Sequence, residues 1–156
     1  MTTLTDLHRA VQSTLASKRL GRPVFVRYLL HSQDKPDAAL PRLAHLTAAV
    51  REWVGQPLER VYAVGTPKGG QVTLTLEFRA GATALVSWAA GPARADGIDL
   101  TVVGNHGALY HDAGSARLWD DAALPPAPDP DRSLLAVLER AVRSGRPEPL
   151  DAGGAP

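Results

Sequence analysis

The sequence contains no cysteine among its 156 residues. This absence excludes disulfide bonds, thiolate nucleophiles and zinc sites built on cysteine. The sequence also lacks an excess of charge of either sign, because 17 basic and 16 acidic residues leave a formal net charge of +1. Since no basic stripe is present, we expect neither a nucleic acid nor a membrane surface as a partner.

Long apolar runs are missing as well. No stretch is long enough to span a bilayer, and residues 1–9 lack the basic and apolar regions of a signal peptide. We therefore expect a cytoplasmic protein. With 44% hydrophobic residues, the chain can bury one core of ordinary size. We predict a single domain over residues 1–146 and a disordered, Gly/Pro-rich tail over residues 147–156.

A glycine-rich phosphate-binding loop is also absent. Residues 65–70 have the outer glycine spacing of a P-loop, but Gln71 and Val72 stand where Lys and Ser/Thr would follow. The segment also leads into a predicted strand, whereas a P-loop leads into a helix. We therefore reject nucleotide binding at this loop. Neither a serine nucleophile elbow nor a pair of acid/base carboxylates is visible.

Hydrophobic periodicity predicts the secondary structure. Apolar residues at helical spacing predict helices from Leu4 to about Ser17, from about Pro41 to Val54, and after Asp131. Alternating residues predict strands, and these segments are 24–31, 58–64, 72–78, 84–88, 98–102 and 108–112, with a short one at 115–119. Residues 32–39 are expected to form a loop, residues 121–130 an irregular stretch, and Asp131 the cap of the last helix. This order predicts an α+β fold, with a mainly antiparallel sheet, two or three helices packed on one face and the opposite face open.

The strand alternation also predicts what lies on each face of the sheet. The apolar face carries Val72, Leu74, Leu76, Ala84, Val86 and Trp88. The opposite face is small and lightly charged, and we predict it as an interface through Thr73, Thr75, Thr83, Leu85, Ser87, Thr101 and Val103. Sheet surfaces that face water more often carry Lys, Glu and Arg. The alternative is an exposed Thr-rich face, because threonine suits strands.

The order of the elements and several motifs resemble the second, sheet-forming domain of the Gfo/Idh/MocA oxidoreductases. The resemblance runs from about Leu7 to Leu150, and its motifs are residues 15–27, the series His45, Trp53, Gly55, Val61 and Ala63, and the hairpin at 104–109. In that family a nicotinamide-binding Rossmann domain normally precedes this domain. The open sheet face of the second domain is commonly where subunits of the family meet.

The resemblance also implies a position for the substrate site. The family places the series D-x-x-x-H-x-x-D around its substrate, and the histidine corresponds to His45. The two carboxylates correspond to Pro41 and Ala48, and the family's Glu-Lys-Pro motif is missing. An imidazole without a carboxylate lacks a group that fixes its tautomer or raises its basicity. His45 is therefore the one remnant candidate, and the alternative is a structural helix histidine.

The remaining candidates favour structural roles. His106, His111 and Asp112 do not suit a metal site, because residues five apart on a strand point to opposite faces. Three aromatic residues at strand spacing are expected in the core, and these are Tyr28, Phe78 and Trp88. Three arginines are expected on a solvated helix face, and these are Arg140, Arg143 and Arg146.

These observations predict a noncatalytic, stand-alone domain that serves as an oligomerisation or partner subunit. We expect a homodimer or a hetero-oligomer with a full-length family member, and no cofactor bound by this chain alone. One alternative is the substrate-binding half of a split NAD(P)-dependent oxidoreductase, completed by a separate Rossmann chain. Another alternative is a small-ligand binder.

Overall fold

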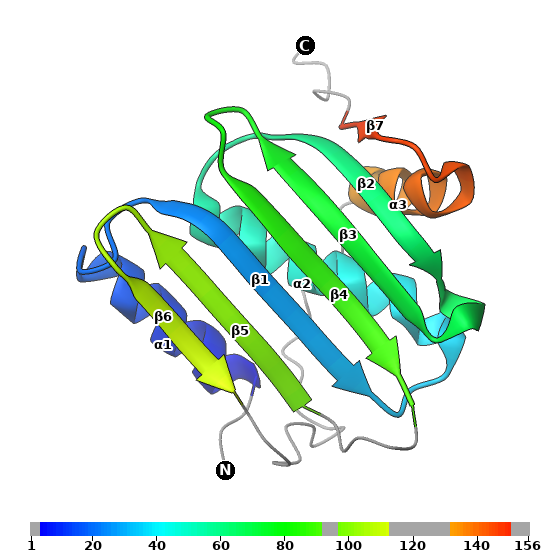
Figure 1. Cartoon of the computed structure of the whole chain (residues 1–156), viewed down its shortest axis with the longest axis horizontal. Helices are drawn as coiled ribbons and strands as arrows, with labels where there is room; N and C mark the ends of the chain where they lie inside the picture. The colour runs from blue at the N-terminus through cyan, green and yellow to red at the C-terminus, as the bar shows by residue number, and fades with distance from the viewer. Residues whose placement is uncertain (1–3, 92–96, 113–131, 151–156) are drawn as a thin grey trace.

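The computed structural model describes residues 4–91, 97–112 and 132–150. Within these ranges one mixed sheet carries three helices, all on the same face (Figure 1). The elements in chain order are α1 (Leu4–Ala16), β1 (Pro23–Ser32), the 3₁₀ turn η1 (Pro36–Ala38), α2 (Ala39–Val54), β2 (Leu58–Thr66), the 3₁₀ turn η2 (Pro67–Gly69), β3 (Gln71–Phe78), β4 (Thr83–Ala90), β5 (Gly97–Gly104), β6 (Ala108–Asp112), α3 (Arg132–Ser144) and β7 (Glu148–Pro149). The predicted α+β class is confirmed.

The strand order in the sheet is β6-β5-β1-β4-β3-β2-β7. All neighbouring strands are antiparallel except β1 and β4, which run parallel with Val26 opposite Ala84. The parallel pair arises because α2 and the β2–β3 hairpin separate these strands in the sequence, so the chain crosses behind the sheet before it returns. The sheet is therefore mainly antiparallel, as predicted.

The core lies between the helices and one sheet face. The predicted apolar residues of β3 and β4 are all buried there, with Trp88 among the largest fully buried side chains. α2 packs behind the centre of the sheet, against β1 and β4, and α3 packs against β2. Each fully buried Leu or Val contributes about 1.5–3 kcal/mol of transfer free energy. No helix in the described part of the chain is long and apolar enough to cross a membrane.

The structure differs from the prediction at two boundaries. α2 begins at Ala39, after η1, in a segment predicted as a loop. Residues 148–150 do not form an irregular tail, because β7 pairs with β2 and the Leu150 N–H donates to the Glu59 carbonyl at 2.9 Å. This pairing gives hydrogen-bond partners to some of the backbone groups on the outer edge of β2. The rest of the predicted tail, the strand at 115–119, the irregular stretch at 121–130 and the cap at Asp131 lie outside the described residues.

Candidate functional site

The predicted remnant residue His45 lies on α2 and faces α1. Its ring stacks on the ring of His8, with centroids 5.9 Å apart and an interplanar angle of 17°. His8 Nε2 lies 2.8 Å from the hydroxyl of Tyr28 on β1, and the tautomer of His8 decides which group donates this hydrogen bond. The two histidines therefore lie where α1, α2 and β1 meet.

Two aromatic rings pack against His8. Trp53 meets the ring of His8 edge to face at a centroid distance of 5.1 Å, and it stacks on Tyr28 at 5.7 Å. Trp53 and Tyr28 are both buried. Such edge-to-face and stacked pairs add about 0.5–1.5 kcal/mol each beyond the area that they bury. The cluster thus fixes the position of α1 on the rest of the molecule.

The surroundings hold both imidazoles in the neutral form. Burial in the first place, and the neighbouring His45 in the second, lower the pKa of His8 from 6.5 to about 4. Burial and then the positive charge of Arg42 lower the pKa of His45. Burial also raises the pKa of Tyr28 above its ordinary value. Each of these groups is therefore uncharged at neutral pH.

The histidine pair lacks the partners that acid–base chemistry needs. Neither ring is hydrogen-bonded to a carboxylate within the described residues. Position 41, one turn before His45, is an exposed proline, and Ala48 occupies the other carboxylate position. The carboxylate of Asp34 instead contacts Arg42 Nε at 3.0 Å. The geometry therefore supplies a packed, neutral imidazole and no group that orients it for proton transfer.

Sequence reasoning missed His8. Its position offers a signal, because it follows Leu7 and lies one turn after Leu4, at the border of the apolar stripe of α1. A polar residue at such a border is partly buried and needs a partner. Its partners, Tyr28 and His45, come from two other elements, so the sequence of α1 alone does not reveal them.

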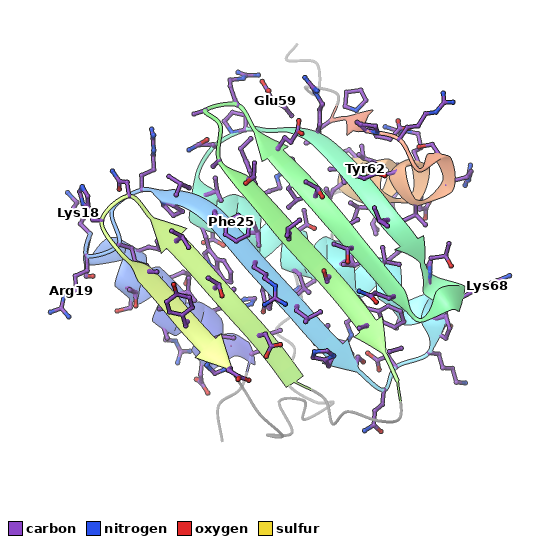
Figure 2. The ribbon with its side chains drawn as sticks, in the orientation of Figure 1. Lys18, Arg19, Phe25, Glu59, Tyr62 and Lys68 are labelled. Atoms are coloured by element: carbon purple, nitrogen blue, oxygen red, sulfur yellow. The ribbon has the colours of Figure 1, made fainter. Side chains whose placement is uncertain are left out.

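The open face of the sheet is the second predicted site, and it faces the viewer in Figure 2. Strand register aligns its side chains in rows across six strands. The central row is Tyr62, Thr75, Leu85, Arg27, Thr101 and Tyr110. All the residues predicted as interface candidates lie on this face, and these are Thr73, Thr75, Thr83, Leu85, Ser87, Thr101 and Val103.

The structure adds apolar residues to this face that the prediction did not include. They are Phe25, Leu29, Tyr62, Val64 and Tyr110. Tyr110 is 74% exposed and Val64 is 54% exposed. The sequence predicted the strands that carry them but did not assign these residues to a face. Because β1 carries apolar residues on both faces, only its pairing with β4 and β5 reveals which side each residue occupies.

Charged side chains on the open face are few, and one ion pair joins two of them. Arg60 Nη1 lies 3.7 Å from Glu77 Oε2, and His31 Nε2 lies 3.8 Å from Asp99 Oδ2. Arg27, in the central row, is exposed and makes no ion pair or hydrogen bond with a described residue. The face is therefore a flat surface of small and aromatic side chains with one unpaired cation near its middle.

The other sequence candidates do not come together in a site. His111 points to the helix side of β6, Asp112 points to the open face, and His106 lies in the β5–β6 turn. Among the described residues no group of three potential ligands could hold a metal ion. Arg140 contacts Glu148 at 3.6 Å, whereas Arg143 is exposed on α3 and Arg146 is exposed beyond its end. Tyr28, Phe78 and Trp88 are buried in the core, as predicted.

Comparisons with known proteins point to dehydrogenases by structure alone. No protein-family model matches the sequence, and neither does any curated protein. A myo-inositol dehydrogenase from Lactobacillus casei, solved with NAD(H) and myo-inositol, aligns with a TM-score of 0.71 and 13% identity over 96% of this chain. A probable dehydrogenase from Thermotoga maritima aligns with a TM-score of 0.70 and 15% identity over 92% of this chain.

The alignments cover only 60% and 61% of those two proteins. The likeness therefore concerns a part of each dehydrogenase, and at these identities it establishes the fold. The resemblance predicted from the sequence motifs, to the sheet-forming domain of the Gfo/Idh/MocA oxidoreductases, is confirmed at this level.

Proposed function

We propose that this chain, which has the fold of the sheet-forming part of inositol dehydrogenases, is a noncatalytic subunit that associates through its open sheet face. Its partner is a second copy of the chain or a full-length protein with the same fold. The composition of the open face carries this proposal. A noncatalytic role also agrees with the absence of carboxylates at positions 41 and 48.

The exposed residues of this face are the types that protein interfaces favour. Aromatic residues and arginine are enriched in interfaces, and lysine and glutamate are depleted. The central row ends in Tyr62 and Tyr110 and includes Arg27. No lysine lies on the described strands of this face, and its glutamate, Glu77, lies 3.7 Å from Arg60. A Thr-rich face that only meets water does not need aromatic residues at both edges.

The size of the face also suits a small dimer. Six strands at about 4.8 Å spacing and three to four rows at about 6.8 Å give roughly 600–800 Å² of flat area. Protruding side chains increase the area that association would bury. A standard interface buries about 800 Å² per partner. Association over the whole face would therefore bury an area close to that of a standard interface.

Light scattering on the purified chain tests the proposal, and we expect a dimer or a larger assembly. The double variant Thr75→Arg with Thr101→Glu should give monomers, because both positions lie in the central row and the new charges would lose their water on association. Both side chains point away from the core, so the variant should fold. Its net charge equals that of the wild type.

A matched control places the same two charges elsewhere. Ala10→Glu with Ser13→Arg changes exposed positions of α1, and this variant should assemble like the wild type. A wild-type chain that stays monomeric at high concentration and forms no complex with a full-length relative would contradict the proposal. Equal assembly of the Thr75→Arg, Thr101→Glu variant and the wild type would contradict the role of the open face.

A second candidate function is the substrate-binding half of a split NAD(P)-dependent oxidoreductase. The observation in its favour is His45, an imidazole on α2 that stays neutral at neutral pH. This candidate requires a separate Rossmann chain that supplies the cofactor and a proton-transfer group. A stable and catalytically active complex with such a chain would favour it over the noncatalytic subunit.

A further inference from the structure

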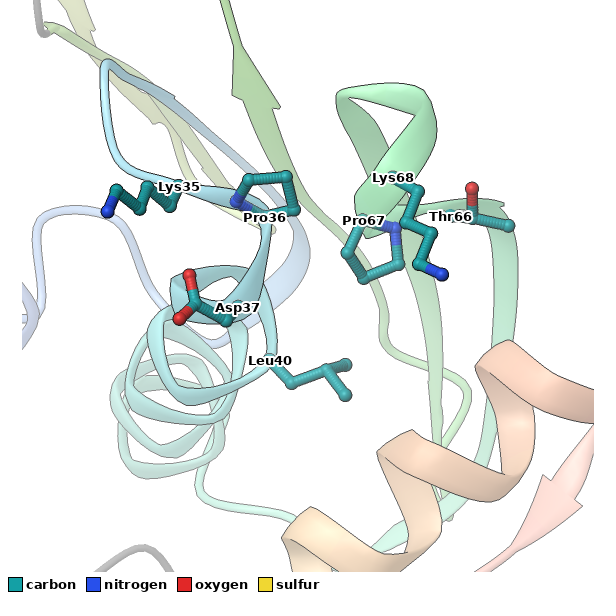
Figure 3. A pocket seen from close by; sticks show the side chains of 7 residues that line it. All are labelled: Lys35, Pro36, Asp37, Leu40, Thr66, Pro67 and Lys68. Atoms are coloured by element: carbon teal, nitrogen blue, oxygen red, sulfur yellow. The ribbon is translucent and has the colours of Figure 1, made fainter.

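A groove opens at the end of the sheet where β1 and β2 finish. One wall comes from η1 and the first turn of α2, and the other comes from the β2–η2 turn (Figure 3). Its volume is about 720 Å³, and it is lined by Lys35, Pro36, Asp37, Leu40, Thr66, Pro67 and Lys68. Small-molecule sites usually measure about 300–1,000 Å³. His45 does not line this groove, so it is separate from the site that the sequence predicted.

The walls of the groove are apolar and stiff. The rings of Pro36 and Pro67 stand on opposite sides of the opening, and Leu40 points into it from α2 (Figure 3). Proline rings fix the backbone, so these walls are formed before a ligand arrives. The hydroxyl of Thr66 already accepts a hydrogen bond from the Gly69 N–H at 3.1 Å. The interior therefore suits the apolar body of a ligand.

The rim of the groove is cationic. The whole sequence contains three lysines, and two of them, Lys35 and Lys68, flank the opening. Both are exposed, and neither makes an ion pair or hydrogen bond with a described residue. Their flexible stems allow the ammonium groups to swing over the opening. In Figure 3 the ammonium of Lys35 and the carboxylate of Asp37 both point away from Leu40 and the gap. The three charged side chains of the lining, Lys35, Asp37 and Lys68, leave the rim with a net charge of +1.

The start of α2 adds to the positive potential. Its own first turn contains no acidic residue and no side chain caps its N-terminus, although Asp37 in η1, directly before it, offsets part of this potential. The N-terminal end of a helix carries a partial positive charge, which favours a nearby anion. Lys35, Lys68 and this helix end thus lie on the two sides of one apolar groove.

We propose that the groove binds a small amphipathic anion. The apolar body of the ligand lies between Pro36 and Pro67 and against Leu40, and its charged head lies at the rim with Lys35 and Lys68. The site is independent of the open face. A ligand here and association through the sheet can therefore fail or succeed separately.

Titration with decanoate, followed by calorimetry and by the methyl NMR signals of Leu40, tests the proposal. Decanol and decyltrimethylammonium are the neutral and cationic probes with the same chain. We expect decanoate to shift the Leu40 signals and to bind more tightly than either of the other probes. The affinity for decanoate should fall as the salt concentration rises, because salt screens exposed charges.

Two variants distinguish the contribution of the rim lysines to binding from that of the apolar walls. Lys35→Glu with Lys68→Glu should weaken decanoate binding about tenfold or more, a change of about 1.4 kcal/mol, and should leave decanol binding unchanged. Leu40→Ser should weaken both probes. The matched control is Lys18→Glu with Arg19→Glu, two exposed positions at the opposite end of the molecule from Lys68 (Figure 2), and it should bind like the wild type.

Three results would overturn the proposal. They are the absence of any Leu40 shift at millimolar decanoate, equal decanoate binding by the wild type and the Lys35→Glu, Lys68→Glu variant, and cation binding as tight as anion binding. Light scattering should show that the variants at the rim keep the oligomeric state of the wild type. Failure of decanoate binding would therefore leave the assembly proposal intact, and loss of assembly would leave the groove proposal intact.

Discussion

His8 is the residue whose surroundings have the clearest energetic consequence. Its imidazole lies between Trp53 and His45 and is hydrogen-bonded to Tyr28, so a proton on this ring would place a charge in an apolar, aromatic site. The pKa of about 4 expresses this cost, since the ordinary value is 6.5. Protonation of His8 therefore favours the unfolded chain over the folded one.

We predict that the free energy of unfolding falls as the pH falls from about 6.5 to 4. In this window the unfolded chain binds a proton at His8 and the folded chain does not, so acid favours the unfolded state. The stability from this group is fully present above pH 6.5 and is lost as the pH falls through the folded pKa of about 4. A shift of this size corresponds to a loss on the order of 3 kcal/mol. Urea unfolding at several pH values measures it.

Two variants distinguish the effect of protonating His8 from the effect of its hydrogen bond with Tyr28. His8→Leu should flatten the pH dependence, because it removes the titrating group. Tyr28→Phe should lower stability at every pH by about 1–2 kcal/mol but keep the slope, because it removes only the hydrogen bond. Parallel pH curves for the wild type and His8→Leu would show that other groups cause the acid sensitivity.

At the scale of single residues, the sequence identified His45 as a partly buried helix histidine but not its surroundings. Periodicity indicates which side of a helix faces the core. It does not indicate which residue of another element lies opposite. The stacking of His45 on His8 and the contact of Arg42 with Asp34 depend on how α1, η1 and α2 pack. That packing follows from the three-dimensional structure.

At the scale of elements, the turn between α1 and β1 packs tightly on the β5–β6 hairpin. The N–H of Asn105 donates to the Arg22 carbonyl at 3.1 Å, and the N–H of His106 donates to the Leu20 carbonyl at 3.0 Å. Gly104 lies directly beneath this turn, and a Cβ built on it would collide with the Leu20 carbonyl oxygen. Because the obstacle is backbone, it cannot move aside as a flexible side chain could.

We predict that Gly104→Ala lowers the free energy of unfolding by about 1–3 kcal/mol through this overpacking. Gly107→Ala in the same hairpin is the control, since its Cβ would meet the Arg19 carbonyl oxygen at an ordinary 3.6 Å. The control should stay within about 0.5 kcal/mol of the wild type. Urea unfolding compares the two, and equal effects would contradict the close approach.

The sequence predicted most of these elements because their faces differ in polarity. The alternation in β3 and β4 indicated both strands and both faces of the sheet. It did not indicate the parallel pairing of β1 with β4, because alternation does not reveal which strands are neighbours. It also missed β7, which is too short for a periodic signal and depends on the edge of β2 for its hydrogen bonds.

At the scale of the whole molecule, the fold is shared with dehydrogenases at only 13–15% identity. A fold of this kind constrains the pattern and volume of buried side chains far more than their identity. Motif order and spacing were therefore enough to predict the resemblance. Chemistry depends on particular residues, so the likeness of the backbone does not carry the activity of the relatives to this chain.

Cofactor binding is the property in which we expect this chain to differ from those relatives. Its one loop with P-loop-like glycine spacing contains η2, and two of the loop's amide groups are already engaged. The Gly69 N–H donates to Thr66 Oγ1, and the Gly70 N–H donates to the Pro67 carbonyl. The loop then enters β3, so no long helix directs its N-terminus at a phosphate.

We therefore predict that the chain alone does not bind NAD(H) or NADP(H) with a dissociation constant below about 1 mM, a standard free energy of about −4 kcal/mol. Calorimetric titration measures this, with the Lactobacillus casei myo-inositol dehydrogenase, which was solved with NAD(H), as the positive control. Binding at micromolar concentration would reveal a phosphate site outside residues 65–70. It would also favour the half-enzyme over the noncatalytic subunit, because an assembly domain has no use for a nicotinamide cofactor. Absence of binding, together with dispersal of the assembly by Thr75→Arg and Thr101→Glu, would leave association as the function that the open face supports.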